Sequence, residues 1–186
     1  TGRHTFNEVF FEDVRVPRDC LVGEDNRGWY VAAATLDFER SGINRVVAGI
    51  RLYEELVEYA AQKTVDGVRL LDLAPVRHKL AEIGIEFTVG RLLAYRVASM
   101  QARGEIPNAE ASMSKLFGSE LQQRLAAAGL SILGLSGQLA PGATWAPLGG
   151  RLEQYYLFAS ALTVAAGTSE IQRGIIAGRG LGLPRG

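Results

Sequence analysis

The sequence contains few of the residues that hold metal ions or form disulfide bonds. Its 186 residues include one cysteine and two histidines, and Cys20, His4 and His78 lie far apart along the chain. A single cysteine excludes an internal disulfide and is typical of a reducing compartment, so we expect a cytoplasmic protein. The spacing of these residues also excludes the clustered ligand sets of zinc sites.

A surplus of charge of either sign is missing too. Lysine plus arginine and aspartate plus glutamate each total 20, which gives a formal net charge of +0. Nucleic-acid-binding proteins usually carry a basic excess, so we expect no nucleic acid among the partners. No apolar run approaches the roughly 20 residues that a membrane span needs. Neither a phosphate-binding P-loop nor a Gly-x-Ser-x-Gly nucleophile motif occurs.

What the sequence does have is apolar residues at helical spacing. Hydrophobic residues make up 47% of the chain, enough for a sizeable core. The pattern predicts helices at about 29–63, 75–103, 109–133, 151–164 and 169–180. Pro75 suits the first turn of the second helix, and Asn108 is a candidate cap for the third. The core stripe of the second helix should include Leu80, Ile83, Phe87 and Leu92. We therefore expect an all-α fold, an antiparallel four-helix-type bundle.

The front of the chain does not fit that bundle. Residues 5–17 are rich in Phe and Val with partial alternation, and this pattern predicts a strand that Pro17 ends. A lone strand is marginal in water, and the rest of the chain offers it no partner. We therefore interpret residues 1–27 as a remnant of the end of a β-domain plus a linker, and residues 28–186 as the helical bundle domain. The absence of an initiator Met favours a fragment of something longer.

The stretch LTVAAGTSEIQR, residues 162–173, contains a turn that opens a helix. Ser169 with Gln172 three residues later fits a capping box, and Gly167 permits a tight turn or the close approach of a ligand. Free N–H groups at the start of a helix can bind an anion. An ordinary capped helix explains the same residues, and from this stretch alone it is the favoured interpretation.

A second stretch, LDFERSGINR at residues 36–45, clusters charged side chains in the first long helix. It fits a solvated helix face with local ion pairs, and it equally fits a carboxylate directed into a cleft as a general base. Glu39 lies four residues before Ile43 and thus next to an apolar neighbour. This favours partial burial of Glu39 and a raised carboxyl pKa.

Four stretches together resemble the acyl-CoA dehydrogenase family over nearly the whole chain. FNEVFFEDVRVPRDCLVGEDNRGW resembles the end of that family's β-domain, and LDFER resembles its first bundle helix. PVRHKLAEI resembles the start of its second bundle helix. AGTSEIQRGIIAGRGLGLPR is similar to its C-terminal signature. The resemblance implies that a helical domain and most of a β-domain precede this bundle in the complete enzyme.

The resemblance also implies a reaction. In that family an active-site carboxylate removes the α-proton of an acyl-CoA thioester, the β-hydrogen leaves as hydride to N5 of FAD, and a trans-2-enoyl-CoA forms. Many members carry the base directly before the Gly-Thr of the signature, where this chain has Ala166. Isovaleryl-type and long-chain-type members carry it on the first bundle helix before an Arg, and Glu39-Arg40 matches them. Glu39 is therefore the expected base, with Asp37, Arg40, Ala166 and Gly167 at the substrate.

The same resemblance assigns residues to FAD. Thr168, Ser169 and Glu170 are expected to contact the flavin dinucleotide. In such enzymes some residues of one subunit bind the FAD of the neighbouring subunit, and this set, the FAD clamp, is altered here. An R-x-x-F-G loop reads KTVDG, which keeps a cation at Lys63, and a Q-x-x-G-G-x-G segment reads SILGLSG, which keeps Gly134 and Gly137. Ala74 stands where such enzymes usually have a Gln, and Leu157-Phe158 stands where they usually have an Arg-Asp pair.

These losses predict an assembly with a second chain. A homotetramer would bind FAD weakly without the missing hydrogen-bond donors. An unlike subunit could supply these donors, as in bacterial members that act on steroid side-chain CoA thioesters. We therefore expect a homo- or hetero-oligomer, a dimer of dimers of bacterial origin, with an electron-transfer flavoprotein as electron acceptor. Two alternatives stay open: a catalytically silent subunit of a heteromeric enzyme, and a relative with other flavin chemistry, such as nitroalkane oxidation or hydroxylation.

Overall fold

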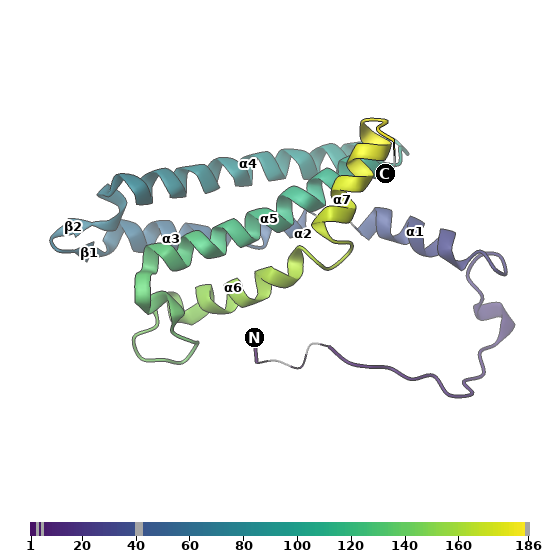
Figure 1. Cartoon of the computed structure of the whole chain (residues 1–186), viewed down its shortest axis with the longest axis horizontal. Helices are drawn as coiled ribbons and strands as arrows, with labels where there is room; N and C mark the ends of the chain where they lie inside the picture. Colours follow the sequence, from purple (N-terminus) through teal and green to yellow (C-terminus); the bar gives the residue numbers. More distant parts are fainter. Residues whose placement is uncertain (3, 5, 40–42, 185–186) are drawn as a thin grey trace.

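The protein is an elongated bundle of antiparallel helices with an extended N-terminal arm (Figure 1). The computed structural model describes residues 1–2, 4, 6–39 and 43–184, without the side chains of residues 36–39. The helices are α1 Gly28–Glu39, α2 Asn44–Val47, α3 Ile50–Gln62, α4 Ala74–Ala102, α5 Asn108–Leu133, α6 Arg151–Leu162 and α7 Ser169–Ile175. The strands are β1 Thr64–Val65 and β2 Val68–Arg69. Short 3-10 turns cover Arg18–Cys20, Leu70–Asp72, Gly134–Gln138 and Pro147–Gly150, and a π turn covers Ile176–Gly180. The predicted all-α class is confirmed.

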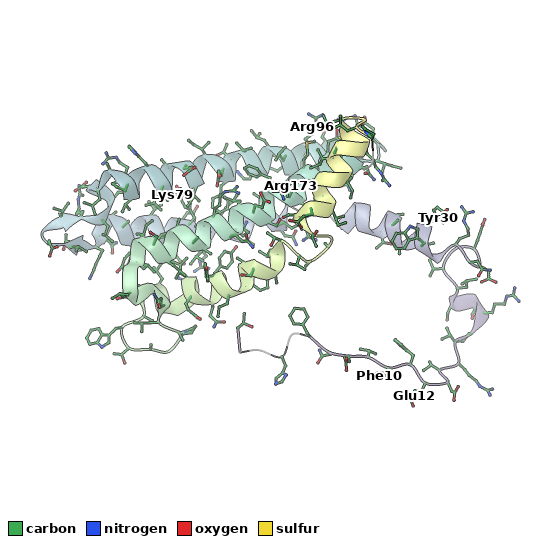
Figure 2. The ribbon with its side chains drawn as sticks, viewed as in Figure 1. Phe10, Glu12, Tyr30, Lys79, Arg96 and Arg173 are labelled. Atoms are coloured by element: carbon green, nitrogen blue, oxygen red, sulfur yellow. The ribbon has the colours of Figure 1, made fainter. Side chains whose placement is uncertain are left out.

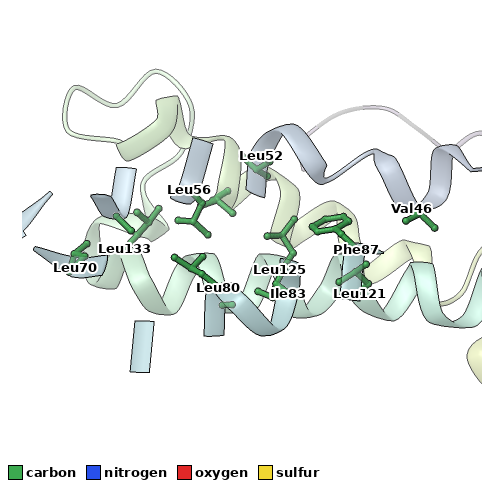
Figure 3. Close-up of a cluster of buried hydrophobic side chains, with 13 residues drawn as sticks. Val46, Leu52, Leu56, Leu70, Leu80, Ile83, Phe87, Leu121, Leu125 and Leu133 are labelled. Atoms are coloured by element: carbon green, nitrogen blue, oxygen red, sulfur yellow. The ribbon is translucent and has the colours of Figure 1, made fainter. Parts of the chain in front are cut away.

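Helix α5 lies at the centre of the bundle. It packs against α4 on one side and α6 on the other, and α7 crosses its N-terminal half. Figure 3 shows the apolar core that α5 shares with α2, α3, α4 and α6. Its buried members include Val46, Leu52, Leu56, Leu80, Ile83, Phe87, Leu121, Leu125 and Leu152. Burial of such side chains stabilises the fold by about 1.5–3 kcal/mol each.

The predicted second helix is confirmed as α4, but one of its predicted core residues is wrong. Pro75 lies in the first turn, where its missing N–H leaves no helical bond unmade. Leu80, Ile83 and Phe87 are buried, whereas Leu92 is 63% exposed. The buried face continues instead through Gly90, Ala94 and Val97. These residues follow Phe87 at helical spacing, while Leu92, five residues on, lies on the opposite face.

The prediction of one helix over 29–63 is wrong, because α2 ends at Val47 and α3 begins only at Ile50. Residues 40–42 lie outside the described part of the chain, and the break that the structure shows is at Ala48–Gly49. Beside that break the Gln122 side chain donates to the carbonyls of Arg45 (2.8 Å) and Val46 (3.1 Å). These carbonyls would otherwise accept helical N–H groups four residues later. A buried amide on α5 thus satisfies the ends that the break exposes.

The predicted strand near the N-terminus is wrong as well. The described residues between 6 and 17 form no strand and are all exposed, and Figure 2 shows Phe10 and Glu12 standing out from an isolated segment. Among the described residues the sheet consists of β1 and β2, whose turn has positive φ at Asp66 (52°) and Gly67 (80°). Without a partner the front segment cannot satisfy its backbone in a ladder, so it stays irregular.

Two smaller predictions concern the ends of elements. Pro107 occupies the N-cap position of α5, and Asn108 is its first helical residue, so the predicted cap at Asn108 is wrong. The predicted helices over 109–133, 151–164 and 169–180 are confirmed within two residues at each start, as α5, α6 and α7 with its π turn. None of the described helices combines the length and apolarity of a membrane span.

Candidate functional site

The turn before α7 has an unusual backbone. Ala166 has φ 56° and Gly167 has φ 91°, so two consecutive residues lie in the left-handed region. For the alanine this costs roughly 1–2 kcal/mol. Thr168 follows as the N-cap, and its Oγ1 accepts from the Ile171 N–H at 3.3 Å. The predicted capping box at Ser169 is therefore wrong, because the cap is one residue earlier.

Two buried side chains hold this turn from inside the bundle. Lys115 of α5 donates from Nζ to the Gly167 carbonyl at 2.7 Å. Gln172 of α7 donates from Nε2 to the carbonyls of Ala166 (3.1 Å) and Gly167 (3.2 Å). Both side chains are 0% exposed. Sequence reasoning missed Lys115, and the one available signal was a lysine among the small residues of ASMSKLFGS.

The predicted row of free N–H groups at the start of α7 is not found. The Ser169 N–H donates to the Thr163 carbonyl at 3.0 Å, and the Gln172 N–H donates to the Thr168 carbonyl at 3.0 Å. The Glu170 carboxylate accepts from its own N–H and from the Thr168 hydroxyl, and these bonds lower the pKa of Glu170. The N–H donors at the start of this short helix are thus used within the turn, which argues against the anion-binding interpretation and agrees with the ordinary capped helix that this stretch alone favoured.

A hollow of about 620 Å³ lies beside the turn, between α5, α7 and the end of α6. Thr168, Ser169 and Glu170 line it on one side. On the same helix, Arg173 is ion-paired with Glu120 of α5, and Figure 2 shows Arg173 where α7 meets α5. The hollow therefore presents hydrogen-bonding groups of both charges, as a polar ligand requires. Ser169 contributes least, because its side chain is buried.

The start of α2 reaches the same stretch of α5 as the turn. A Cβ on Gly118 would lie 3.5 Å from the Arg45 carbonyl, and Lys115, which binds Gly167, is one helical turn earlier on α5. Of the residues predicted at the substrate, Asp37 and Glu39 lie in α1. Their side chains, and Arg40 as a whole, lie outside the described part of the chain. Glu39 is six residues before Arg45, a stretch of chain that spans at most about 20 Å.

The other predicted cofactor residues lie at the far end of the bundle. Lys63 directly precedes β1, and Gly134 and Gly137 lie in the turn after α5, whereas α7 lies toward the opposite end (Figure 1). Lys63 is exposed. Gly134 adopts φ 60°, ψ −145°, a region almost closed to other residues. A Cβ on Gly137 would lie 3.0 Å from that of Leu133. Within one chain these residues thus lie far from the turn. The backbone conformation at Gly134 and the close packing at Gly137 explain why both positions are glycine.

Comparison with known proteins identifies the fold. The family model described as "Acyl-CoA dehydrogenase, C-terminal domain" matches residues 26–181. The chain belongs to the acyl-CoA dehydrogenase family. Among curated members it is 33% identical to acyl-CoA dehydrogenase IpdE1 of Mycobacterium tuberculosis, over 100% of this chain and 46% of that protein. It is 34% identical to the human mitochondrial short-chain specific acyl-CoA dehydrogenase, over 95% of this chain and 41% of that protein.

Solved acyl-CoA dehydrogenases share the arrangement of helices. The structure titled "Tcur3481-Tcur3483 steroid ACAD" superposes with a TM-score of 0.83 at 32% identity, over 95% of this chain and 45% of that one. The ChsE4-ChsE5 complex from Mycobacterium tuberculosis gives a TM-score of 0.82 at 34% identity, over 95% of this chain and 46% of that one. The chain spans less than half the length of these relatives.

Proposed function

We propose that this chain is the C-terminal domain of an FAD-dependent acyl-CoA dehydrogenase in which Glu39 is the catalytic base. The observation that carries the proposal is the rigid Ala166–Gly167 turn, which matches the family's signature yet bears a methyl group where many members have a carboxylate. A base must then come from another element. Glu39 is the candidate that immediately precedes an Arg on the first bundle helix, in the isovaleryl-type arrangement.

Glu170, the carboxylate beside the turn itself, is unsuited to be the catalytic base. Glu170 is exposed, and hydrogen bonds from its own N–H and from Thr168 lower its pKa. A general base works best with a pKa near the operating pH, so a carboxyl group with a lowered pKa is a poor proton acceptor. Glu39, on a helix that leads to the same part of α5, is the better candidate.

The residues at the hollow fit part of a flavin dinucleotide. When bound, FAD would supply the hydride acceptor of the dehydrogenation. Thr168 and Glu170 line the hollow with a hydroxyl and a carboxylate, groups that can bind the hydroxyls of a ribose or ribityl chain directly or through water. Ala166 and Gly167 present little side-chain bulk, which leaves space for an acyl thioester beside the turn. Lys63, Gly134 and Gly137 would serve a flavin of a neighbouring subunit.

That division of residues supports a heteromeric assembly. The chain keeps the turn but carries Lys63, Ala74 and Leu157-Phe158 where a neighbour's flavin is usually bound. One solved relative is titled a ChsE4-ChsE5 complex, and another a "Tcur3481-Tcur3483 steroid ACAD". A curated relative is named as a subunit of a caffeyl-CoA reductase-Etf complex. We extend these to a pairing with an unlike subunit, a bulky acyl-CoA substrate and an electron-transfer flavoprotein as acceptor.

A spectral titration tests the proposal. The complete flavoprotein, purified with its co-expressed partner, is titrated anaerobically with a panel of straight-chain, branched and polycyclic acyl-CoA thioesters. We expect at least one thioester to bleach the visible flavin absorbance and to yield the 2-enoyl product. If none of the thioesters bleaches the flavin, but a nitroalkane or another donor reduces it, the result would favour different flavin chemistry.

A silent subunit is the second candidate, and the altered clamp favours it. Flavin content tests the need for an unlike subunit when this gene is expressed alone and together with its partner, and the rate of flavin reduction in the Glu39→Gln complex then separates a silent subunit from an active one. The heteromeric proposal predicts well under one flavin per chain for the protein made alone. A homotetramer with one flavin per chain contradicts the need for an unlike subunit.

A further inference from the structure

Lys115 is an unusual residue for the centre of a helical bundle. Its side chain is 0% exposed, although lysine is almost never fully buried unless it is paired. The buried residues around it on α5 are small, which lets the turn before α7 approach closely; they are Ala111, Ser112, Ser114, Gly118 and Ser119. The ammonium donates to the carbonyl oxygen of Gly167, which lies 52 residues away in sequence.

That oxygen belongs to the part of the turn that is hardest to keep in one conformation. Ala166 and Gly167 both have positive φ, and a glycine in such a position can rotate its following peptide at little cost. Gln172 binds the Gly167 carbonyl at 3.2 Å, while Lys115 binds it at 2.7 Å. The charge-assisted bond is the shorter and stronger of the two, so it is the main restraint on this peptide.

The restraint decides which way the turn presents its donors. In a trans peptide the C=O and N–H groups point in opposite directions. Since the carbonyls of Ala166 and Gly167 point inward to Gln172 and Lys115, the N–H groups of Gly167 and Thr168 point away from them. No described residue accepts a hydrogen bond from either group. A rotated Gly167–Thr168 peptide would turn one of these donors into the bundle.

We propose that Lys115 is a positioning residue, which fixes the Ala166–Gly167 turn from inside the bundle so that the N–H groups of Gly167 and Thr168 face a bound ligand. The link to catalysis rests on the proposed function. The ligand atom is a hydrogen-bond acceptor, such as the carbonyl oxygen of a thioester or an oxygen of the cofactor. Lys115 itself contacts neither.

The test is amide hydrogen exchange by NMR on the full chain, comparing Lys115→Met with the wild type. Methionine keeps most of the length and an unbranched apolar stem but cannot donate. We expect exchange at Ser169 and Ile171, whose N–H groups bond to Thr163 and Thr168, to accelerate at least about tenfold. Core amides such as that of Leu125 should be unchanged. Lys79→Met, which removes an exposed lysine on α4, is the matched control and should leave the turn unaltered.

Unchanged exchange at the turn, or acceleration only in step with the core amides, would overturn the proposal. If Lys115→Met does not fold, the wild type still decides: the Lys115 ammonium must show a scalar coupling across its hydrogen bond to the Gly167 carbonyl carbon, and its absence is contrary evidence. In the complete flavoprotein, Lys115→Met should lower kcat/KM at least about tenfold with flavin content unchanged. The exchange result requires no activity, so it stands or fails independently of the proposed function.

Discussion

Thr168 shows how much one hydroxyl can organise. Its Oγ1 accepts from the Ile171 N–H at 3.3 Å, and its O–H donates to the Glu170 carboxylate. The same group thus caps α7 and fixes the first charged side chain of that helix. Because Ala166 and Gly167 directly precede it, the cap also ends the strained part of the turn.

Replacing Thr168 by alanine should therefore affect both stability and ionisation. Loss of the cap is expected to lower the free energy of unfolding by about 1 kcal/mol, measured by urea denaturation. The pKa of Glu170 should rise toward its ordinary value, as followed by carboxyl NMR. A folded-state pKa below the unfolded one contributes stability above the unfolded pKa, and this contribution is lost as pH falls through the folded pKa.

Thr88→Ala provides the control. Thr88 is exposed, and its hydroxyl donates to the Gly84 carbonyl within α4, so it caps nothing. The free energy of unfolding should change by less than about 0.5 kcal/mol. Equal losses in the two variants would show that Thr168 is an ordinary surface threonine.

At the scale of the elements, glycines set how closely the helices approach. A Cβ on Gly90 of α4 would lie 2.8 Å from Val46 Cγ1 of α2, and one on Gly129 of α5 would lie 2.5 Å from Leu152 Cδ2 of α6. Contacts this short require a shift of the neighbour. The absence of a side chain at these two positions therefore lets α2 pack closely against α4, and α6 against α5.

Gly90→Ala and Gly174→Ala should move stability in opposite directions. At Gly90 the added methyl group should overpack the contact with α2 and lower the free energy of unfolding by about 1–3 kcal/mol. At Gly174, where a Cβ would meet nothing within 4 Å, the higher helix propensity of alanine should raise it by up to about 1 kcal/mol. Thermal and urea unfolding of both variants check this, and a stabilised Gly90→Ala would contradict the close approach.

The helices that the sequence could predict were those whose apolar period is uninterrupted, the short α6 and α7 among them. Helices α4 and α5 follow from apolar spacing and from Pro75. The break between α2 and α3 could not be predicted, because the Gln122 amide that satisfies it comes from a different helix. For the same reason the role of Lys115 could not be predicted: a lysine among small residues was its one signal, and its partner Gly167 lies 52 residues away.

At the scale of the whole molecule, the front of the chain and the bundle behave as separate parts. All described residues of the segment 1–27 are exposed, including large apolar side chains such as Phe6, Phe10 and Phe11. Among the described residues α1 also packs along no other helix, and Trp29 and Tyr30 are exposed. Large apolar side chains exposed in this number are typical of a surface that contacts further protein, which agrees with the interpretation of residues 1–27 as the remnant of a β-domain.

Removal of residues 1–27 should therefore leave the bundle intact. We expect the midpoint of thermal unfolding to change by less than about 2 °C, because little apolar surface is buried there. Truncation after Ile175 is the contrasting variant, since the segment Ile176–Gly180 packs on α5. It should lower the midpoint clearly. A large loss on removing 1–27 would contradict the proposed domain boundary.

The site was predicted in part. The sequence indicated the turn at Gly167 and Thr168, and the structure confirms a tight turn there, with the cap moved by one residue. That Lys63 and Gly134 lie at the other end of the bundle from this turn follows from the packing of long helices, which no local pattern encodes. The assignment of Glu39 stays a prediction.

The central claim is that Glu39 removes the α-proton, and stopped-flow flavin reduction of Glu39→Gln tests it most directly. Removing the base should slow reduction by a productive acyl-CoA by about 10²–10⁴-fold, with flavin content unchanged. Glu58→Gln, at an exposed position of α3, should reduce at the wild-type rate. Reduction of Glu39→Gln at the wild-type rate would place the base elsewhere, in the partner subunit or on another element.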